Sequence, residues 1–262
     1  MVPTTDTAPG DVSSVSRFYD LLAPDYDRMT GFEKRFVHEK PFFRLLVERY
    51  GITAALDAGC GTGFHALLLA QLGVAVTAVD VSREMLHVLD AHAREYGLDI
   101  NMVESSFADL PSKVHRTYDA VFCLGNSLAH MASNEALQAT LENFASVLKK
   151  GGILFLQNLN YDRILRTRKR VQSVKEVDGV MYVRFYDYEG SSIRFNILRL
   201  ERKDGGVTHT LESIPLRPVM KKDLLERLDL TGFGEVRTYG GITMEEFVPE
   251  ESKDLVVLAR RT

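Results

Sequence analysis

The feature that most constrains the fold is an alternation of short apolar segments with segments of helical periodicity between residues 55 and 159. Strands are expected over 55–59, 74–80, 100–105, 118–125 and 153–159, because each is a short, largely apolar run bounded by turns. Helices are expected between them over 64–73, 82–97 and 134–150, with Ser82 capping the second. This alternation predicts a parallel sheet with helices on both faces.

The two ends of the chain extend this pattern. A short helix broken near Pro24 is expected over 16–29, followed by a second helix that stops at Gly51. Lys149 and Lys150 are expected in the last turn of the helix over 134–150, where the helix dipole favours cations. A helix over 221–233 and strands over 235–240 and 254–261 complete the domain.

The alternation of strands and helices ends after Asn160. Alternating polar and apolar residues run from about Val171 to Ile214, interrupted by Gly190 and by the glycine-rich turn at 204–206. We therefore predict a small antiparallel β insertion over 161–215, covering the acceptor side of the main domain. The main domain is expected over 15–160 and 216–262, with its N-terminal helices as a lid, and residues 1–14 are expected to form a mobile tail.

Composition narrows the class of protein. With 262 residues, 45% hydrophobic and 26% charged, the chain can bury a substantial core. A net charge of -4 argues against a global nucleic-acid surface, and two cysteines provide neither a disulfide framework nor a zinc site. The N-terminus lacks the basic and apolar regions of a secretory signal, and no apolar run reaches bilayer-spanning length. A cytoplasmic protein without a membrane partner is expected, and the sequence leaves room for a homo-oligomer without specifying one.

The sharpest local signal is the segment LDAGCGTG, which joins the first expected strand to its helix. Gly59 and Gly61 allow a ligand to approach the backbone closely, and the next strand ends at Asp80, whose carboxylate can accept hydrogen bonds from ribose hydroxyls. A glycine turn that only packs strand against helix is the simpler alternative. A dinucleotide fold is the stronger rival, but its GxGxxG pattern needs a third glycine where Phe64 or His65 stands. A nucleotide without a pyrophosphate is the more natural ligand.

The chain resembles the class I S-adenosylmethionine-dependent methyltransferases. The resemblance rests on LDAGCGTG, VTAVDVSREML, ESSFADLP, YDAVFCLGNSLAH and a helix ending in LKKGG, in this order and spacing. It implies an α/β fold with a Rossmann-like, doubly wound sheet of seven strands whose last strand is antiparallel. It also implies S-adenosyl-L-methionine as cofactor.

The resemblance assigns roles by position. Gly59, Cys60 and Gly61 would lie against the methionine part of the cofactor, and Asp80 would hold the ribose. The residues implied around the adenine and the sulfonium are Met85, Ser106, Phe107 and Leu124. Asp57 is either an organiser of the glycine turn or a simple helix cap.

A narrower resemblance points to glycine and glycine/sarcosine N-methyltransferases. It rests on CLGNSLAH over 123–130 and LNYDRIL over 159–165. Arg35 lies 22 positions before Asp57, as does the arginine that binds the cofactor carboxylate in that group. The resemblance also implies a shielding role for Tyr26 or Tyr19, and it implies catalytic roles for Asn126 at the acceptor and His130 at the cofactor. Without the motif, His130 would be read as a core histidine.

One departure concerns the acceptor. The glycine enzymes bind the substrate carboxylate with an arginine just before the NYD segment, and this chain has Leu159 there. A leucine cannot pair with a carboxylate, so glycine is doubtful as the substrate. Arg163, Arg184 or Arg194 could supply the missing charge, although no pattern identifies one of them.

Three further patterns have competing interpretations. Tyr182, Tyr186 and Tyr188 share one strand face, which is either an amine-binding wall or, slightly favoured, a solvent-exposed face. Cys60 and Cys123 are interpreted as packing residues. The basic residues between 163 and 170 could contact RNA, but a solvated surface is favoured.

The sequence therefore predicts a methyltransferase that acts on a small molecule, with an amine nitrogen favoured as acceptor. The alternatives are a cofactor-binding regulatory protein without turnover, an RNA methyltransferase that uses the basic residues, and an NAD-dependent oxidoreductase.

Overall fold

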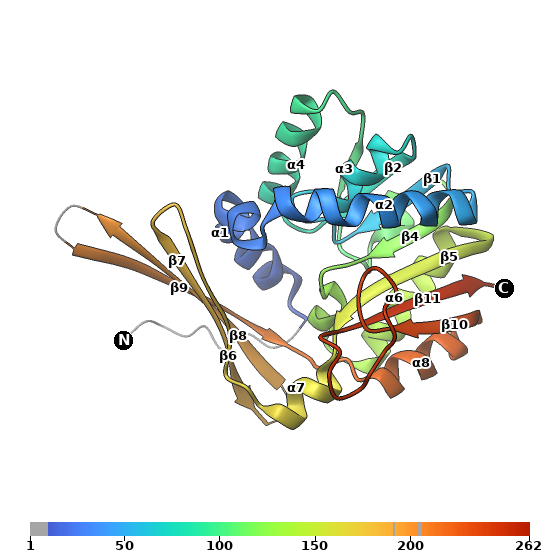
Figure 1. Cartoon of the computed structure of the whole chain (residues 1–262). Coiled ribbons are helices and arrows are strands. Elements are labelled where there is room, and N and C mark those ends of the chain that lie inside the picture. The colour runs from blue at the N-terminus through green and yellow to red at the C-terminus, as the bar shows by residue number, and fades with distance from the viewer. Residues whose placement is uncertain (1–9, 191, 204–205) are drawn as a thin grey trace.

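The computed structural model describes residues 10–190, 192–203 and 206–262. A seven-stranded sheet forms the centre of the main domain, and a separate four-stranded antiparallel sheet projects from its side (Figure 1). The central order is β10-β11-β5-β4-β1-β2-β3. These strands are β1 (Ala54–Ala58), β2 (Ala75–Asp80), β3 (Asn101–Glu104), β4 (Tyr118–Cys123), β5 (Leu148–Leu159), β10 (Phe233–Tyr239) and β11 (Asp254–Arg261). β11 is antiparallel to both β10 and β5, and the other neighbouring pairs are parallel, which confirms the predicted fold class.

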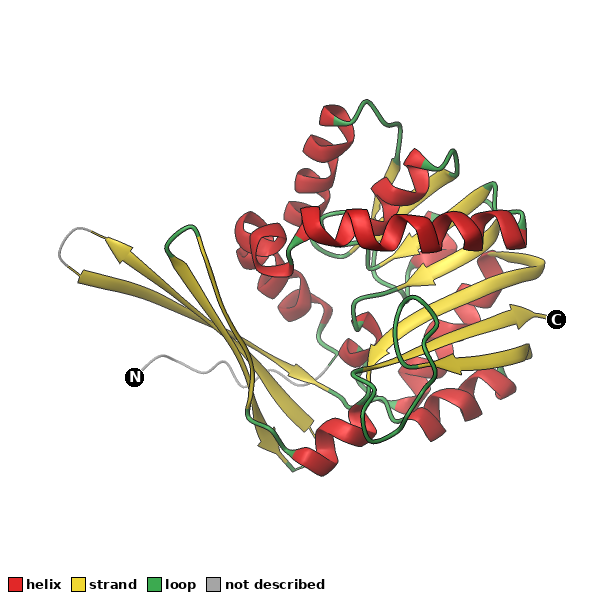
Figure 2. Ribbon diagram, in the orientation of Figure 1, coloured by secondary structure: helices red, strands yellow, loops and turns green. Residues whose placement is uncertain are grey.

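Helices cover both faces of the central sheet (Figure 2). One face packs against α2 (Phe32–Tyr50), α3 (Phe64–Gln71) and α4 (Arg83–Glu95). The other packs against α5 (Leu110–Lys113), α6 (Asn134–Val147) and α8 (Lys221–Leu230). Successive residues of β4 supply the two cores in turn: Ala120 and Phe122 face one, Val121 and Cys123 the other. Because apolar side chains project from both faces of the sheet into a core, the sequences of these strands are continuous apolar runs.

Two details of the expected helices are wrong. α1 (Val12–Thr30) continues through Pro24, because Phe18, Leu22 and Met29 on both sides of the proline are buried and hold the helix together. α6 ends at Val147, so Lys149 belongs to β5, where its Nζ lies 2.6 Å from the Asp119 carboxylate at the start of β4. A specific ion pair replaces the expected helix-dipole interaction.

The start of α1 shortens the expected tail. Asp11 is the N-cap and accepts a hydrogen bond from the Ser13 N–H, so residues 12–14 are helical. Residues 1–9 lie outside the described residues. The predicted end of the second helix at Gly51 is confirmed, since Gly51 follows α2 with a φ of 59°. The predicted cap at Ser82 is also confirmed, since the Ser82 hydroxyl accepts a hydrogen bond from the Met85 N–H.

The insertion begins with α7 (Tyr161–Thr167) and continues as a four-stranded sheet. Its strands pair in chain order: β6 (Val171–Val177), β7 (Val180–Glu189), β8 (Ser192–Lys203) and β9 (Gly206–Leu216). The turn at Gly190 is observed with a φ of 57°, whereas the turn at 204–205 lies outside the described residues. Tyr182 and Tyr186 are buried against α1 and α7, so the solvent-exposed interpretation is wrong for these two residues, whereas Tyr188 is half-buried.

None of the helices in the described part of the chain has the length and apolar character that crossing a membrane requires.

Candidate functional site

A cavity of about 1030 Å³, counting its open mouth, lies at the carboxyl ends of β1, β2, β3 and β4. Open α/β sheets bind ligands at this edge because the loops after the strands converge there. The walls come from two parts of the chain: the loops after the strands, and the cover formed by α1, α2 and η1 (Ser127–His130). The residues that line the cavity are Gly10, Val12, Val15, Tyr19, Tyr26, Thr30, Arg35, Gly59, Cys60, Gly61, Thr62, Phe64, His65, Asp80, Val81, Ser105, Ser106, Phe107, Leu124, Gly125, Ser127, His130 and Met131.

The glycine turn after β1 has a conformation that requires glycine. Gly59, Gly61 and Gly63 all have positive φ angles, of 75°, 55° and 86°. A Cβ on Gly59 would lie 2.6 Å from the Ser127 Oγ, whereas a Cβ on Gly61 would meet only Tyr26, at 3.7 Å. The turn therefore presents bare backbone to the cavity.

Asp80 links the turn to the next strand. Its Oδ2 accepts a hydrogen bond of 2.8 Å from the Gly61 N–H, and its Oδ1 accepts one of 2.9 Å from the Ser82 N–H. Burial raises the pKa of this carboxyl, and the backbone donors partly oppose that shift. Each oxygen retains acceptor capacity toward the cavity.

Aromatic side chains of α1 form the facing wall. The Tyr19 hydroxyl lies 2.9 Å from the His130 Nε2, and the rings of Tyr19 and Tyr26 pack edge to face. Burial raises the pKa of Tyr19 well above its usual value and lowers the pKa of His130 to about 4. His130 is therefore neutral near pH 7, and its Nδ1 has no hydrogen-bond partner among the described residues.

Arg35 of α2 brings a cation to the cavity wall. Its Nε donates to the Glu39 Oε1 at 2.8 Å, and its guanidinium stacks on the Phe64 ring at 4.1 Å. Glu39 also contacts His65, with 3.2 Å between the carboxylate and Nε2. The arginine is thus held in place by side chains of α2 and α3.

Most of the expected site residues meet in this cavity. The residues that line it are Tyr19, Tyr26, Arg35, Gly59, Cys60, Gly61, Asp80, Ser106, Phe107, Leu124 and His130.

Three expected residues do not line the cavity. Met85 is fully buried in the packing between α4 and α1, and Val81 lies at the cavity instead. The Asn126 amide is occupied, since its Oδ1 accepts from the Leu159 N–H and its Nδ2 donates to the Tyr161 hydroxyl.

Asp57 is the third. It is buried beneath the turn, and burial, together with the Asp80 charge, raises its pKa to about 7. The Ala66 N–H, in the first turn of α3, opposes this shift. The Asp57 Oδ2 has no hydrogen-bond partner among the described residues, and α3 begins without a side-chain cap.

Some cavity residues were missed by sequence reasoning. Val81, Ser105 and Ser127 stand inside or beside motifs already identified, so their neighbours were the available signal. Val12 and Val15 had no such signal, because only the packing of α1 brings them to the cavity.

The cysteines and the basic residues show no separate site. Burial raises the pKa of both thiols, so Cys60 and Cys123 stay protonated, and Cys123 is a core residue. In the basic segment, Arg166 pairs with Glu250 at 3.0 Å and Arg170 with Asp187 at 2.7 Å, which reduces the charge available to an RNA backbone. Within the described residues, no group of histidine, cysteine and carboxylate side chains could hold a metal ion.

Comparison with known proteins shows which families this chain is similar to. Residues 55–152 match a family described as a methyltransferase domain. A glycine/sarcosine N-methyltransferase of Aphanothece halophytica is 33% identical over 86% of this chain and 83% of its own length. A second, from Halorhodospira halochloris, is 30% identical over 85% of this chain and 81% of its own length. A solved S-adenosylmethionine-dependent methyltransferase from Clostridium acetobutylicum superimposes with a TM-score of 0.79, covering 93% of this chain and 98% of its own at 18% identity.

Proposed function

The chain belongs to the S-adenosylmethionine-dependent methyltransferase family, and we propose that it methylates an amine nitrogen of its small-molecule acceptor. The observation that carries the choice of nitrogen is the match to N-methyltransferases over more than four-fifths of both chains. A continuous match of this extent includes the glycine turn, η1 and the insertion.

The cavity fits the cofactor of this family. We propose that Asp80 accepts hydrogen bonds from the ribose hydroxyls, that Arg35 binds the carboxylate, and that the glycine turn lies against the methionine part. Val81, Ser106 and Phe107 would then border the adenine. When bound, the cofactor supplies a methyl group activated by a sulfonium. The protein has mainly to align donor and acceptor, which can contribute roughly 7–11 kcal/mol.

The protein residues nearest the acceptor are poor bases. His130, with a pKa of about 4, is too weak to deprotonate an ammonium, and Tyr19 remains protonated because burial raises its pKa. In this proposal the amine arrives neutral, and the Tyr19–His130 pair orients its lone pair. The rate should therefore rise with pH until the free amine itself is deprotonated.

The basic residues near the cavity further restrict the chemical class of the acceptor. Among the described residues that line the cavity, Arg35 is the sole lysine or arginine, and it already pairs with Glu39. Leu159 stands where the glycine enzymes have arginine, Arg184 bonds to Ser173, and Arg194 bonds to Glu189. The Arg163 Nε has no hydrogen-bond partner among the described residues, but Arg163 does not line the cavity. These observations support an amine without a carboxylate next to the nitrogen.

A panel assay tests both parts of this proposal. Release of S-adenosylhomocysteine is measured with glycine, sarcosine, methylamine, ethanolamine, a phenol and a thiol at equal concentration. Turnover with the carboxylate-free amines, rising with pH, is expected. Turnover with the phenol or thiol alone would reject nitrogen, and turnover with glycine and sarcosine alone would reject the charge argument. In the latter case Leu159→Arg should leave glycine turnover unimproved.

A further inference from the structure

α1 lies between the main domain and the insertion (Figure 1). Five of its residues line the cavity: Val12, Val15, Tyr19, Tyr26 and Thr30. On the main-domain side, the Asp27 carboxylate accepts a hydrogen bond from the Thr62 hydroxyl. Nearly two helical turns earlier, Asp20 accepts a 2.6 Å hydrogen bond from the Ser82 hydroxyl. These contacts attach α1 to the loops that follow β1 and β2.

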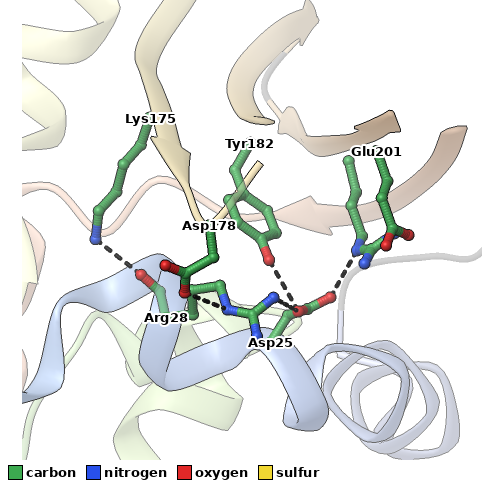
Figure 3. Close-up of polar contacts among 7 residues, drawn as sticks. Asp25, Arg28, Lys175, Asp178, Tyr182 and Glu201 are labelled. Atoms are coloured by element: carbon green, nitrogen blue, oxygen red, sulfur yellow. Dashed lines mark hydrogen bonds and ion pairs between the residues drawn. The ribbon is translucent and has the colours of Figure 1, made fainter. Parts of the chain in front are cut away.

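A second set of contacts reaches α1 from the insertion and converges on Asp25 (Figure 3). Its Oδ1 accepts a 2.8 Å hydrogen bond from the Tyr182 hydroxyl of β7, and its Oδ2 accepts a 2.7 Å bond from the Arg199 Nε of β8. The Arg199 guanidinium is itself held by Glu201, at 2.9 Å. Tyr182 is buried and Asp25 is about a quarter exposed, so the donors lie where water competes only in part.

The end of α1 is held by the same sheet. The Lys175 Nζ of β6 donates to the carbonyl oxygens of Arg28 and Met29, at 2.9 and 3.1 Å. These carbonyls belong to the last turn of the helix, where a cation is favourable. Near them, the Arg28 Nε lies 3.6 Å from the exposed Asp178 carboxylate. Three strands of the insertion therefore contact the C-terminal half of α1.

We propose that Asp25 is a positioning residue: its bonds to Tyr182 and Arg199 set the rotation of α1 over the cofactor cavity. Tyr26 follows Asp25 directly, so on a helix the two side chains point about 100° apart, one to the insertion and the other to the cavity. A helix transmits a rotation along its length. Asp25 thus holds Tyr26 over Gly61 and, nearly two turns away, Tyr19 against His130. The insertion thereby fixes the orientation of the part of the cavity wall that α1 forms.

The test combines cofactor affinity with a measurement that needs no cofactor. Asp25→Asn keeps the shape of the side chain but removes the charge that Arg199 pairs with. Calorimetry with S-adenosylmethionine should give a Kd about tenfold higher, the change expected if α1 is correctly placed in only about a tenth of the variant molecules. In the cofactor-free protein, the α1 amides should exchange hydrogen for deuterium faster, while the central strands keep their protection.

Matched variants separate positioning from general destabilisation. Glu176→Gln removes an exposed carboxylate from β6 and should leave both readouts unchanged. Arg199→Gln should reproduce the effect of Asp25→Asn, and Arg199→Lys, which keeps the charge, should be milder. If Asp25→Asn does not fold, Tyr182→Phe, which removes one donor to the same carboxylate, should show both changes to a smaller extent.

Three results would overturn the proposal. They are an unchanged Kd with unchanged α1 exchange, equal effects in Glu176→Gln, and faster exchange throughout the central sheet with unchanged cofactor affinity. Because neither readout involves an acceptor, this test can fail without affecting the amine proposal, and the reverse also holds.

Discussion

The two walls of the cofactor cavity are built in different ways. The loop wall is the glycine turn with Asp80, and its hydrogen bonds are made largely by backbone groups: the Gly59 N–H donates to the Val79 carbonyl and the Gly61 N–H to Asp80. The cover wall is made by side chains from distant segments. Tyr19 meets His130 over 111 positions, and Asp25 meets Arg199 over 174.

This difference predicts how each wall responds to change. Backbone bonds in a turn that requires glycine leave little room for movement, so the loop wall should keep its shape with or without a ligand. The cover depends on ionisable and partly exposed pairs, which are sensitive to pH, salt and single substitutions. The cover is therefore where binding and release can be adjusted.

The largest expected effect concerns pH and the cover. The pKa of His130 is about 4 in the folded protein, against an ordinary value of 6.5, so the unfolded chain binds a proton first. Stability from this residue is present above pH 6.5 and is lost as the pH falls to about 4, a decline of about 3 kcal/mol. Urea unfolding of the protein and of His130→Gln, followed from pH 7 to 4, should show a shallower decline in the variant.

His87→Gln is the control, since His87 is an exposed histidine on α4. An identical pH dependence in the parent protein and in His130→Gln would contradict the prediction, because it would show that water reaches His130 where α1 contacts η1.

The next effect concerns the loop wall. Asp80→Ala removes the carboxylate and leaves the Gly61 and Ser82 N–H groups without their acceptor. Cofactor affinity by calorimetry should fall at least about tenfold, because a hydrogen bond to a charged group is worth about 1.5–3 kcal/mol. Glu104→Ala, at the end of the neighbouring strand β3, removes an exposed carboxylate paired with Arg83 and serves as the control. Equal affinities in the two variants would contradict the assignment of the cavity.

The smallest effect is expected for Cys60→Ala. Cys60 contributes its backbone to the turn, where its N–H donates to the Val79 carbonyl, and its thiol stays protonated. The cofactor Kd should change less than about twofold, since alanine keeps that backbone conformation. A large loss of turnover in this variant would instead reveal a chemical role for the thiol.

The loop wall could be anticipated from residues that are close in the sequence. The strand that ends at Ala58, the glycines that follow it and the acid at the end of the next strand are all visible in two short segments. The orientation of single side chains was harder to predict. Met85 is turned into the packing against α1, and Pro24 is accommodated within that helix, because burial of the residues around each outweighs its local preference.

The amino-acid sequence by itself determined the alternation of the longer strands and helices and the chemistry of the glycine turn, and its resemblance to a known family supplied the antiparallel last strand. All of these depend on periodicity, on backbone conformations that need glycine, or on motifs of adjacent residues. The tertiary structure decided which side chains close the cavity. The Tyr19–His130 contact, the buried tyrosines of β7 and the bonds that converge on Asp25 arise when α1 packs between two sheets. No pattern of neighbouring residues encodes such contacts, since their energies depend on burial and distance in the folded chain.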